Sequence, residues 1–170
     1  MSSPGIDPRQ EANKLLTLNG ITTPAVSVEK IAKNLNVKVE YAPLEPELSG
    51  LAHIRDGIAI VGINALHSPA RQRFTLAHEL GHVRLHWDIL ERAVHVDKGS
   101  LRRDSLSSTG TDPIERQANA FAAELLMPEF LFKQAIGERS VDLEDDLLVQ
   151  ALAKKFRVSE AAIRFRIGAI

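Results

Sequence analysis

The stretch Phe74–His86, FTLAHELGHVRLH, combines an apolar helical pattern with an unusual amount of imidazole. Ser68-Pro69 precedes it and is typical of an N-cap followed by a first-turn proline, so we expect a helix to begin there. Apolar residues surround most of this helix. One narrow polar stripe runs along it, made of Thr75, His78, Glu79, His82 and His86. Because an unpaired imidazole is costly to bury, the stripe favours a buried site over a solvated helix face.

Three residues of the stripe, His78, Glu79 and His82, form the pattern H-E-x-x-H. Histidines four residues apart lie one above the other on a helix, about 6 Å apart along its axis, so their rings can converge on one small cation. Glu79 lies one residue round the helix, where it can hold a metal-bound water and carry its proton. Zinc suits two imidazoles, a carboxylate and an open position, and Mn²⁺ and Fe²⁺ accept the same donors. We therefore expect peptide hydrolysis with Glu79 as the catalytic base.

A third metal ligand is expected from the helix that begins at Asp112. Glu115 is the best-placed carboxylate, although a glutamate three residues after an N-cap also fits a capping box, in which it binds only a backbone N–H. Asn119 lies one turn further on and is placed to orient a ligand histidine. Alanines near it would let this helix approach the first one closely. Glu124 and Glu129 are weaker alternatives as ligands.

Composition limits the other possibilities. The chain has 170 residues and no cysteine, which excludes disulfides, thiol nucleophiles and thiolate metal sites. The formal net charge is -1, so no strongly charged partner is indicated by the total. No segment has the pattern of a signal peptide or a membrane span, and we expect a soluble, cytoplasmic protein.

Periodicity along the chain predicts an α+β fold. We expect helices near 8–19, 27–35, 68–86, 112–127, 129–136, 143–155 and 159–167, and strands near 37–41, 51–55 and 58–63. Asp56-Gly57 favours a two-residue hairpin turn between the last two strands. A polar segment from Asp97 to Pro113 is predicted to be an exposed loop. The sheet would therefore have about three strands, beside a helix pair of the zincin type.

The residues resemble those of a known family. HELGH, followed by ERQANAFAAELLMP from Glu115 to Pro128 and preceded by NALHSPARQRFTLA from Asn64 to Ala77, resembles the ImmA/IrrE family of HExxH metallo-endopeptidases. The resemblance implies His78, His82 and Glu115 as metal ligands and Glu79 as the catalytic residue. It also implies a zincin-like fold and a specific protein substrate, a helix-turn-helix (XRE-type) repressor, in a stress or mobile-element response. The alternative is a binding module without proteolysis, which controls a repressor or toxin partner by complex formation.

Two further features have open interpretations. Donors for the oxygen that becomes negative during hydrolysis could be Tyr41, His53, His95, Arg102 or Arg103, and nothing in the sequence chooses among them. The strand over Ser49–Arg55 could present its edge to an extended substrate, provided that it lies at the edge of the sheet.

His86 is too far from His78 to share its metal, and we expect it to be a structural or cleft residue.

The C-terminal segment resembles a helix-turn-helix. We divide the chain into a metallopeptidase domain over 1–140 and a C-terminal helical pair over 141–170 that packs on it. Arg164 and Arg166 belong to the most basic part of the chain, but Ile163 and Ile167 have the spacing of core residues. We therefore expect contact with the core or with a partner repressor in preference to direct DNA binding.

Overall fold

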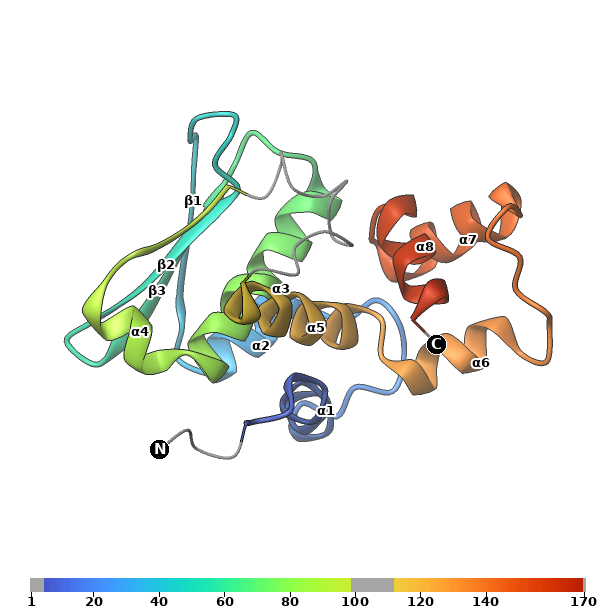
Figure 1. Ribbon diagram of the computed structural model, residues 1–170, viewed down its shortest axis with the longest axis horizontal. Coiled ribbons are helices and arrows are strands. Elements are labelled where there is room, and N and C mark those ends of the chain that lie inside the picture. The colour runs from blue at the N-terminus through green and yellow to red at the C-terminus, as the bar shows by residue number, and fades with distance from the viewer. Residues whose placement is uncertain (1–4, 99–111, 170) are drawn as a thin grey trace.

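The fold is α+β, as the sequence predicts (Figure 1). The computed structural model describes residues 5–98 and 112–169. In chain order the elements are α1 (Pro8–Leu18), α2 (Val28–Asn34), β1 (Lys38–Ala42), β2 (Gly50–Arg55), β3 (Ile58–Asn64), α3 (Pro69–Leu85), α4 (Trp87–Arg92), β4 (His95–Asp97), α5 (Pro113–Leu126), α6 (Glu129–Ile136), α7 (Asp146–Phe156) and α8 (Glu160–Gly168). The polar segment predicted as a loop, with Arg102 and Arg103, lies almost entirely outside the described residues.

The sheet is mixed and has four described strands in the order β1-β3-β2-β4, one more than the sequence predicts. β1 runs parallel to β3, whereas β2 is antiparallel to both β3 and β4. The hairpin between β2 and β3 turns at Asp56 and Gly57, whose φ angles are 51° and 74°. Positive φ at both central residues is the requirement of a type I′ turn, which explains the Asp-Gly pair.

β2 does not lie at the edge of the sheet next to the cluster of histidines. Gly50, Leu51 and Ala52 pair with β4 on one side and with β3 on the other. The hypothesis that the strand over Ser49–Arg55 offers its edge to a substrate is therefore wrong over this part. Among the described strands, β4 occupies that edge.

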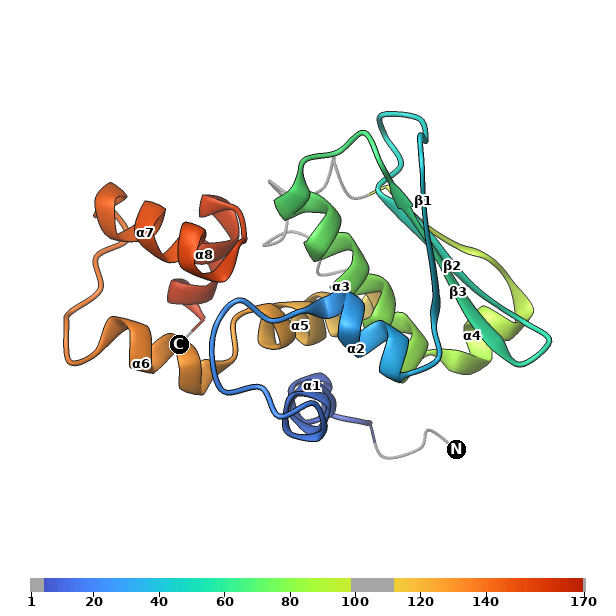
Figure 2. The ribbon, with the colours of Figure 1, turned by 180° about the vertical axis from the view of Figure 1, so that it is seen from behind.

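α3 lies between the sheet and α5, and α1 packs on the far side of α5 (Figures 1 and 2). Two glycines allow the close packing on either side of α3. A Cβ atom on Gly50 would lie 2.7 Å from Thr75 Cγ2, and one on Gly81 would lie 3.1 Å from Ala118 Cα. The helix with the histidines is therefore held tightly by the sheet and by α5.

The C-terminal helices share the hydrophobic core with the rest of the chain. The rings of Phe132 and Phe156 lie 5.4 Å apart, and Arg166 of α8 forms a buried ion pair of 2.6 Å with Glu124 of α5. Arg73 Nε also donates a hydrogen bond to the carbonyl of Arg157 in the turn between α7 and α8. These contacts agree with packing on the core, while the division into two domains stays a prediction. None of the described helices is long and apolar enough to cross a membrane.

Candidate metal centre

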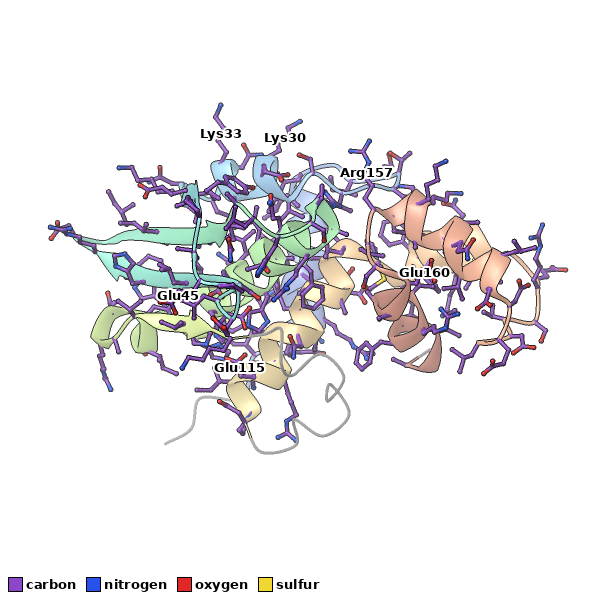
Figure 3. All side chains as sticks on the ribbon, turned by 90° about the horizontal axis from the view of Figure 1, so that it is seen from above. Lys30, Lys33, Glu45, Glu115, Arg157 and Glu160 are labelled. Carbon is purple, nitrogen blue, oxygen red and sulfur yellow. The ribbon has the colours of Figure 1, made fainter. Side chains whose placement is uncertain are left out.

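Three predicted ligands converge where α3 crosses the beginning of α5. His78 and His82 bring their Nε2 atoms within 3.1 Å of each other. The carboxylate of Glu115 reaches both rings, with Oε2 at 3.2 Å from His78 Nε2 and Oε1 at 3.1 Å from His82 Nε2. The labelled Glu115 lies at the end of α5 that is remote from Arg157 and the C-terminal helices (Figure 3). Both histidines are almost completely buried.

The other interpretations of the acidic residues do not fit the described contacts. Asp112 caps α5 by accepting from the backbone N–H of Ile114, whereas the carboxylate of Glu115 faces the imidazoles instead of the helix terminus. Glu124 pairs with Arg166, and Glu129 pairs with Lys133. Neither of these alternatives is part of the cluster.

The outer nitrogens of both histidines have partners. His78 Nδ1 lies 2.9 Å from Asn119 Oδ1, an acceptor, so Nδ1 donates the proton and Nε2 carries a lone pair. His82 Nδ1 lies 3.0 Å from His86 Nδ1, and His86 Nε2 lies 2.8 Å from Gln117 Oε1. Because the amide oxygen can only accept, His86 donates from Nε2 and accepts at Nδ1, which leaves His82 with its Nε2 lone pair.

Two lone pairs that face each other at 3.1 Å repel unless a cation lies between them. The hydrogen-bond partners therefore hold both rings in the form that binds a divalent ion, and Glu115 supplies a compensating negative charge. The sequence predicts His86 as a structural or cleft residue and indicates no role for Gln117. Only the fold brings these two side chains together, so their spacing in the sequence carries no signal.

Glu79 is fully buried, and neither of its carboxylate oxygens has a hydrogen-bond partner among the described residues. Burial raises its pKa above the ordinary value for glutamate, against the opposing effect of nearby imidazoles. A carboxyl group with a raised pKa and no hydrogen bond among the described residues is well suited to take and return a proton. The donor set and this buried carboxylate together fit a hydrolytic metal site.

The electrostatics of the cluster favour positive charge, since burial opposes protonation of His95 but contacts with Glu115 and Glu79 outweigh it and raise the pKa of His95 to about 10. Burial opposes protonation of His78, but contact with Glu115 outweighs it and raises the pKa of His78 to about 9. Burial and the adjacent imidazoles lower the pKa of His82 to about 3 despite the same carboxylate. Burial would raise the pKa of Glu115, but its contacts with the imidazoles lower it strongly. The cluster thus stabilises a cation, and a proton and a metal ion compete for the same place.

The candidate donors for the developing oxyanion are placed differently. His95 on β4 lies in the cluster, with Nε2 at 2.7 Å from Glu115 Oε1 and Nδ1 at 3.4 Å from Glu79 Oε2. Tyr41 lies on β1, the opposite edge of the sheet. His53 follows the buried Ala52 along β2, so its side chain points to the other face of the sheet. Of the described candidates, only His95 lies in the cluster.

A helix pair that brings together two imidazoles, a carboxylate and a further buried glutamate beside a small sheet is the arrangement found in zincin-type metallopeptidases. The chain belongs to the family of IrrE N-terminal-like domains, Peptidase_M78, which matches residues 32–168. This is a metallopeptidase family.

Proteins similar to the chain include a phage protein and a solved bacterial structure. One is the uncharacterized immunity region protein 2 of Bacillus phage phi105, which is 29% identical over 105 residues, covering 62% of this chain and 61% of that protein. The chain thus matches less than two thirds of the phage protein's length. The other is a solved structure of a Mycobacterium tuberculosis transcriptional regulator. The match has a TM-score of 0.59 and covers 95% of this chain and 56% of the regulator's chain. At 17% sequence identity, this second likeness shows the fold alone.

Proposed function

We propose that the chain is a zinc-dependent endopeptidase that cleaves one protein substrate, a helix-turn-helix (XRE-type) repressor, in a stress or mobile-element response. The observation that carries the proposal is the fully buried Glu79, which has no hydrogen-bond partner among the described residues, beside three convergent ligand groups, His78, His82 and Glu115. The family supports peptide hydrolysis, and the relative named for a phage immunity region supports a repressor as the target.

The residues of the chain have separate roles in this mechanism. His78, His82 and Glu115 would hold the ion, with Asn119 and His86 fixing the two rings through their outer nitrogens. A bound zinc ion would supply an acidic water and polarise the scissile carbonyl. Glu79 takes a proton from the attacking water and returns it to the departing amine.

The substrate would bind in extended form along β4. This strand is the edge of the described sheet next to the cluster, and its residue His95 reaches the cluster directly. An added strand would satisfy its backbone through hydrogen bonds to β4, while side-chain contacts would give specificity. The segment cleaved must therefore be extended, which favours a linker or an unfolded part of the repressor.

Glu79→Gln separates proteolysis from control by binding alone. A candidate XRE-type repressor would be co-expressed with the wild-type chain, with Glu79→Gln, or with Glu40→Gln as a matched change at an exposed position of β1. We expect cleavage at one bond with the wild type and Glu40→Gln, and a loss of at least about 10³-fold in rate with Glu79→Gln, because the proton carrier is removed. Repressor control that survives in Glu79→Gln would instead show the binding module.

Direct DNA binding by the C-terminal pair is not supported by its contacts. Arg164 pairs with Asp146 and Glu160, and Arg166 is buried against Glu124. Phosphate contacts depend on available cations, and these two arginines are already used within the chain. We therefore expect no salt-sensitive DNA shift from the wild-type protein.

A further inference from the structure

A small cavity lies between α1, α5 and α8, and none of the three predicted metal ligands lines it. Ala120 and Ala123 of α5 and Phe165 of α8 give it apolar walls. Its volume of about 230 Å³ is below the range of about 300–1,000 Å³ that is usual for small-molecule sites. The cavity therefore has room for a compact ligand with an apolar body.

Two arginines bring positive charge to this cavity. Arg9 of α1 and Arg116 of α5 line it with exposed side chains, and neither guanidinium has a hydrogen bond or ion pair among the described residues. None of the described residues that line the cavity is acidic. The nearby carboxylates of Glu124 and Glu129 are already paired with other side chains. A guanidinium binds a carboxylate through two parallel hydrogen bonds, so the cavity suits an anionic group of this kind.

Two donors in the cavity wall lack acceptors. Arg166 is 3% exposed and binds Glu124 through one η nitrogen, while its buried Nε has no hydrogen-bond partner among the described residues. Asn119 accepts from His78 Nδ1 with its Oδ1, and its Nδ2 donates to no described residue. Both side chains line the cavity. An anionic acceptor bound there would supply a partner for donors that the described chain leaves unused.

We propose that this cavity is a binding site for a small carboxylate with an apolar body, and that the bound carboxylate strengthens metal binding through Asn119. The apolar body packs against Ala120 and Phe165, and the carboxylate pairs with Arg116. By accepting from Asn119 Nδ2, the carboxylate holds the amide with Oδ1 toward His78, which keeps the lone pair of His78 Nε2 for the metal. The site adds control by a small molecule to the proposed function.

The coupling between the two sites acts in both directions. A ligand that raises the affinity for Zn²⁺ by a given factor is itself bound more tightly by the same factor when Zn²⁺ is present, because the binding free energies form a closed cycle. A small carboxylate would thereby act as the signal that fills the metal centre.

The first test is isothermal titration calorimetry of benzoate on the metal-free protein. Benzamide lacks the charge of benzoate, acetate lacks its apolar body, and inorganic phosphate replaces the carboxylate. Arg116→Gln removes a cation from the cavity, and Ala120→Leu fills the cavity. Arg55→Gln is the matched control, at an exposed position of β2.

We expect benzoate to bind the wild type and Arg55→Gln equally, and to bind Arg116→Gln at least about tenfold more weakly. Ala120→Leu should bind no benzoate, and the three other compounds should bind the wild type at least about tenfold more weakly than benzoate does. No binding of benzoate to the wild type would overturn the site, and so would equal affinities in the wild type, Arg116→Gln and Ala120→Leu. Phosphate that binds as tightly as benzoate would overturn the assignment to a carboxylate.

The second test measures Zn²⁺ affinity by competition with a chromophoric chelator, with and without saturating benzoate. We expect benzoate to raise the Zn²⁺ affinity of the wild type at least about fivefold. It should leave that of Ala120→Leu unchanged, which excludes direct binding of benzoate to the ion. Asn119→Asp keeps an oxygen acceptor for His78 Nδ1–H but loses the Nδ2 donor, so benzoate should not raise its Zn²⁺ affinity. Equal Zn²⁺ affinity of the wild type with and without benzoate would overturn the coupling.

The two tests keep the cavity and the metal centre separate. A wild type that binds no Zn²⁺ overturns the metal centre and the proposed function, whereas calorimetry on the metal-free protein still decides whether the cavity binds benzoate. Far-UV circular dichroism establishes whether Ala120→Leu folds. If it does not, the double variant Arg9→Gln with Arg116→Gln takes its place, since both side chains are exposed, and it should bind no benzoate.

Discussion

At the scale of single residues, the imidazole pair His82 and His86 decides how well the metal is held. His86→Ala removes the acceptor for His82 Nδ1 and leaves that buried donor without a partner. The ring of His82 is then free to turn, and the loss of such an outer contact costs about 10–100-fold in metal affinity. We expect this loss in Zn²⁺ affinity, measured by competition with a chromophoric chelator. The control His53→Ala should bind Zn²⁺ with the affinity of the wild type.

Gln117 provides a finer test of the same relay. Gln117→Glu keeps an acceptor for His86 Nε2–H, so Zn²⁺ affinity should stay within a few-fold of wild type. Gln117→Leu removes the acceptor and should approach the loss seen for His86→Ala. If both variants bind Zn²⁺ alike, His86 does not orient His82 through its tautomer.

At the scale of elements, the sequence predicts what local spacing determines and misses what the fold determines. The pattern around His78 places two imidazoles on one helical face whatever the rest of the chain does. Glu115 could be a capping residue or a ligand by its sequence, and only the crossing of α3 and α5 brings it to the histidines. β4 has three residues and α4 has six, too few for either periodicity to be recognised. The contact of His95 with the cluster therefore could not be predicted.

The crossing of α3 and α5 depends on Gly81. An added Cβ would lie 3.1 Å from Ala118 Cα and 3.2 Å from its carbonyl oxygen, which are backbone atoms that cannot rotate away. Gly81→Ala should push α5 outward, lower the free energy of unfolding by about 1–3 kcal/mol and weaken Zn²⁺ binding, because Glu115 moves with the helix. Gly168→Ala in α8 is the control, since nothing lies within 4 Å of its Cβ position. Urea unfolding of the metal-free and Zn²⁺-loaded proteins measures both effects, and equal stability of the two variants would contradict the prediction.

An ion pair between α1 and α3 makes a pH-dependent contribution to stability. Lys14 and Arg84 bind the carboxylate of Glu11 at 2.6 Å and 2.9 Å. The hydrogen bond from Lys14, opposed by burial and aided by Arg84, holds the pKa of Glu11 below its ordinary value of 4.5. A carboxylate with a lowered pKa stabilises the fold above its unfolded pKa, and this contribution disappears as the pH falls below 4.5 through the folded pKa.

Glu11→Gln should therefore lower the free energy of unfolding by about 1 kcal/mol at neutral pH, a modest loss because Lys14 and Arg84 can both reach water. The difference in unfolding free energy from wild type should vanish in strongly acidic solution. Urea unfolding of both proteins from neutral to strongly acidic pH measures this difference, with Glu40→Gln as the exposed control. A difference that does not change with pH would show that shape, and not charge, is responsible.

At the scale of the whole molecule, the ion pair of Arg166 and Glu124 joins the C-terminal helices to the helix that carries Glu115. Both side chains are 3% exposed, and Glu124 also accepts from the backbone N–H of Glu129 at the start of α6. Arg166→Met leaves the carboxylate of Glu124 buried without its cation, and breaking a buried pair in this way costs about 3–5 kcal/mol.

Restoring neutrality separates the charge from the packing. The double variant Arg166→Met with Glu124→Gln removes both charges, and the amide oxygen of the new glutamine can still accept the backbone N–H of Glu129. We therefore expect the double variant to regain most of the stability that Arg166→Met loses. Glu124 lies in the same helix as Glu115 and Asn119, so loss of this ion pair should also weaken metal binding at the histidine cluster. Thermal unfolding with and without Zn²⁺ should show the stabilisation by the ion reduced in Arg166→Met and recovered in the double variant. If stabilisation by Zn²⁺ is the same in all three proteins, the C-terminal pair folds onto the core without influencing the metal centre.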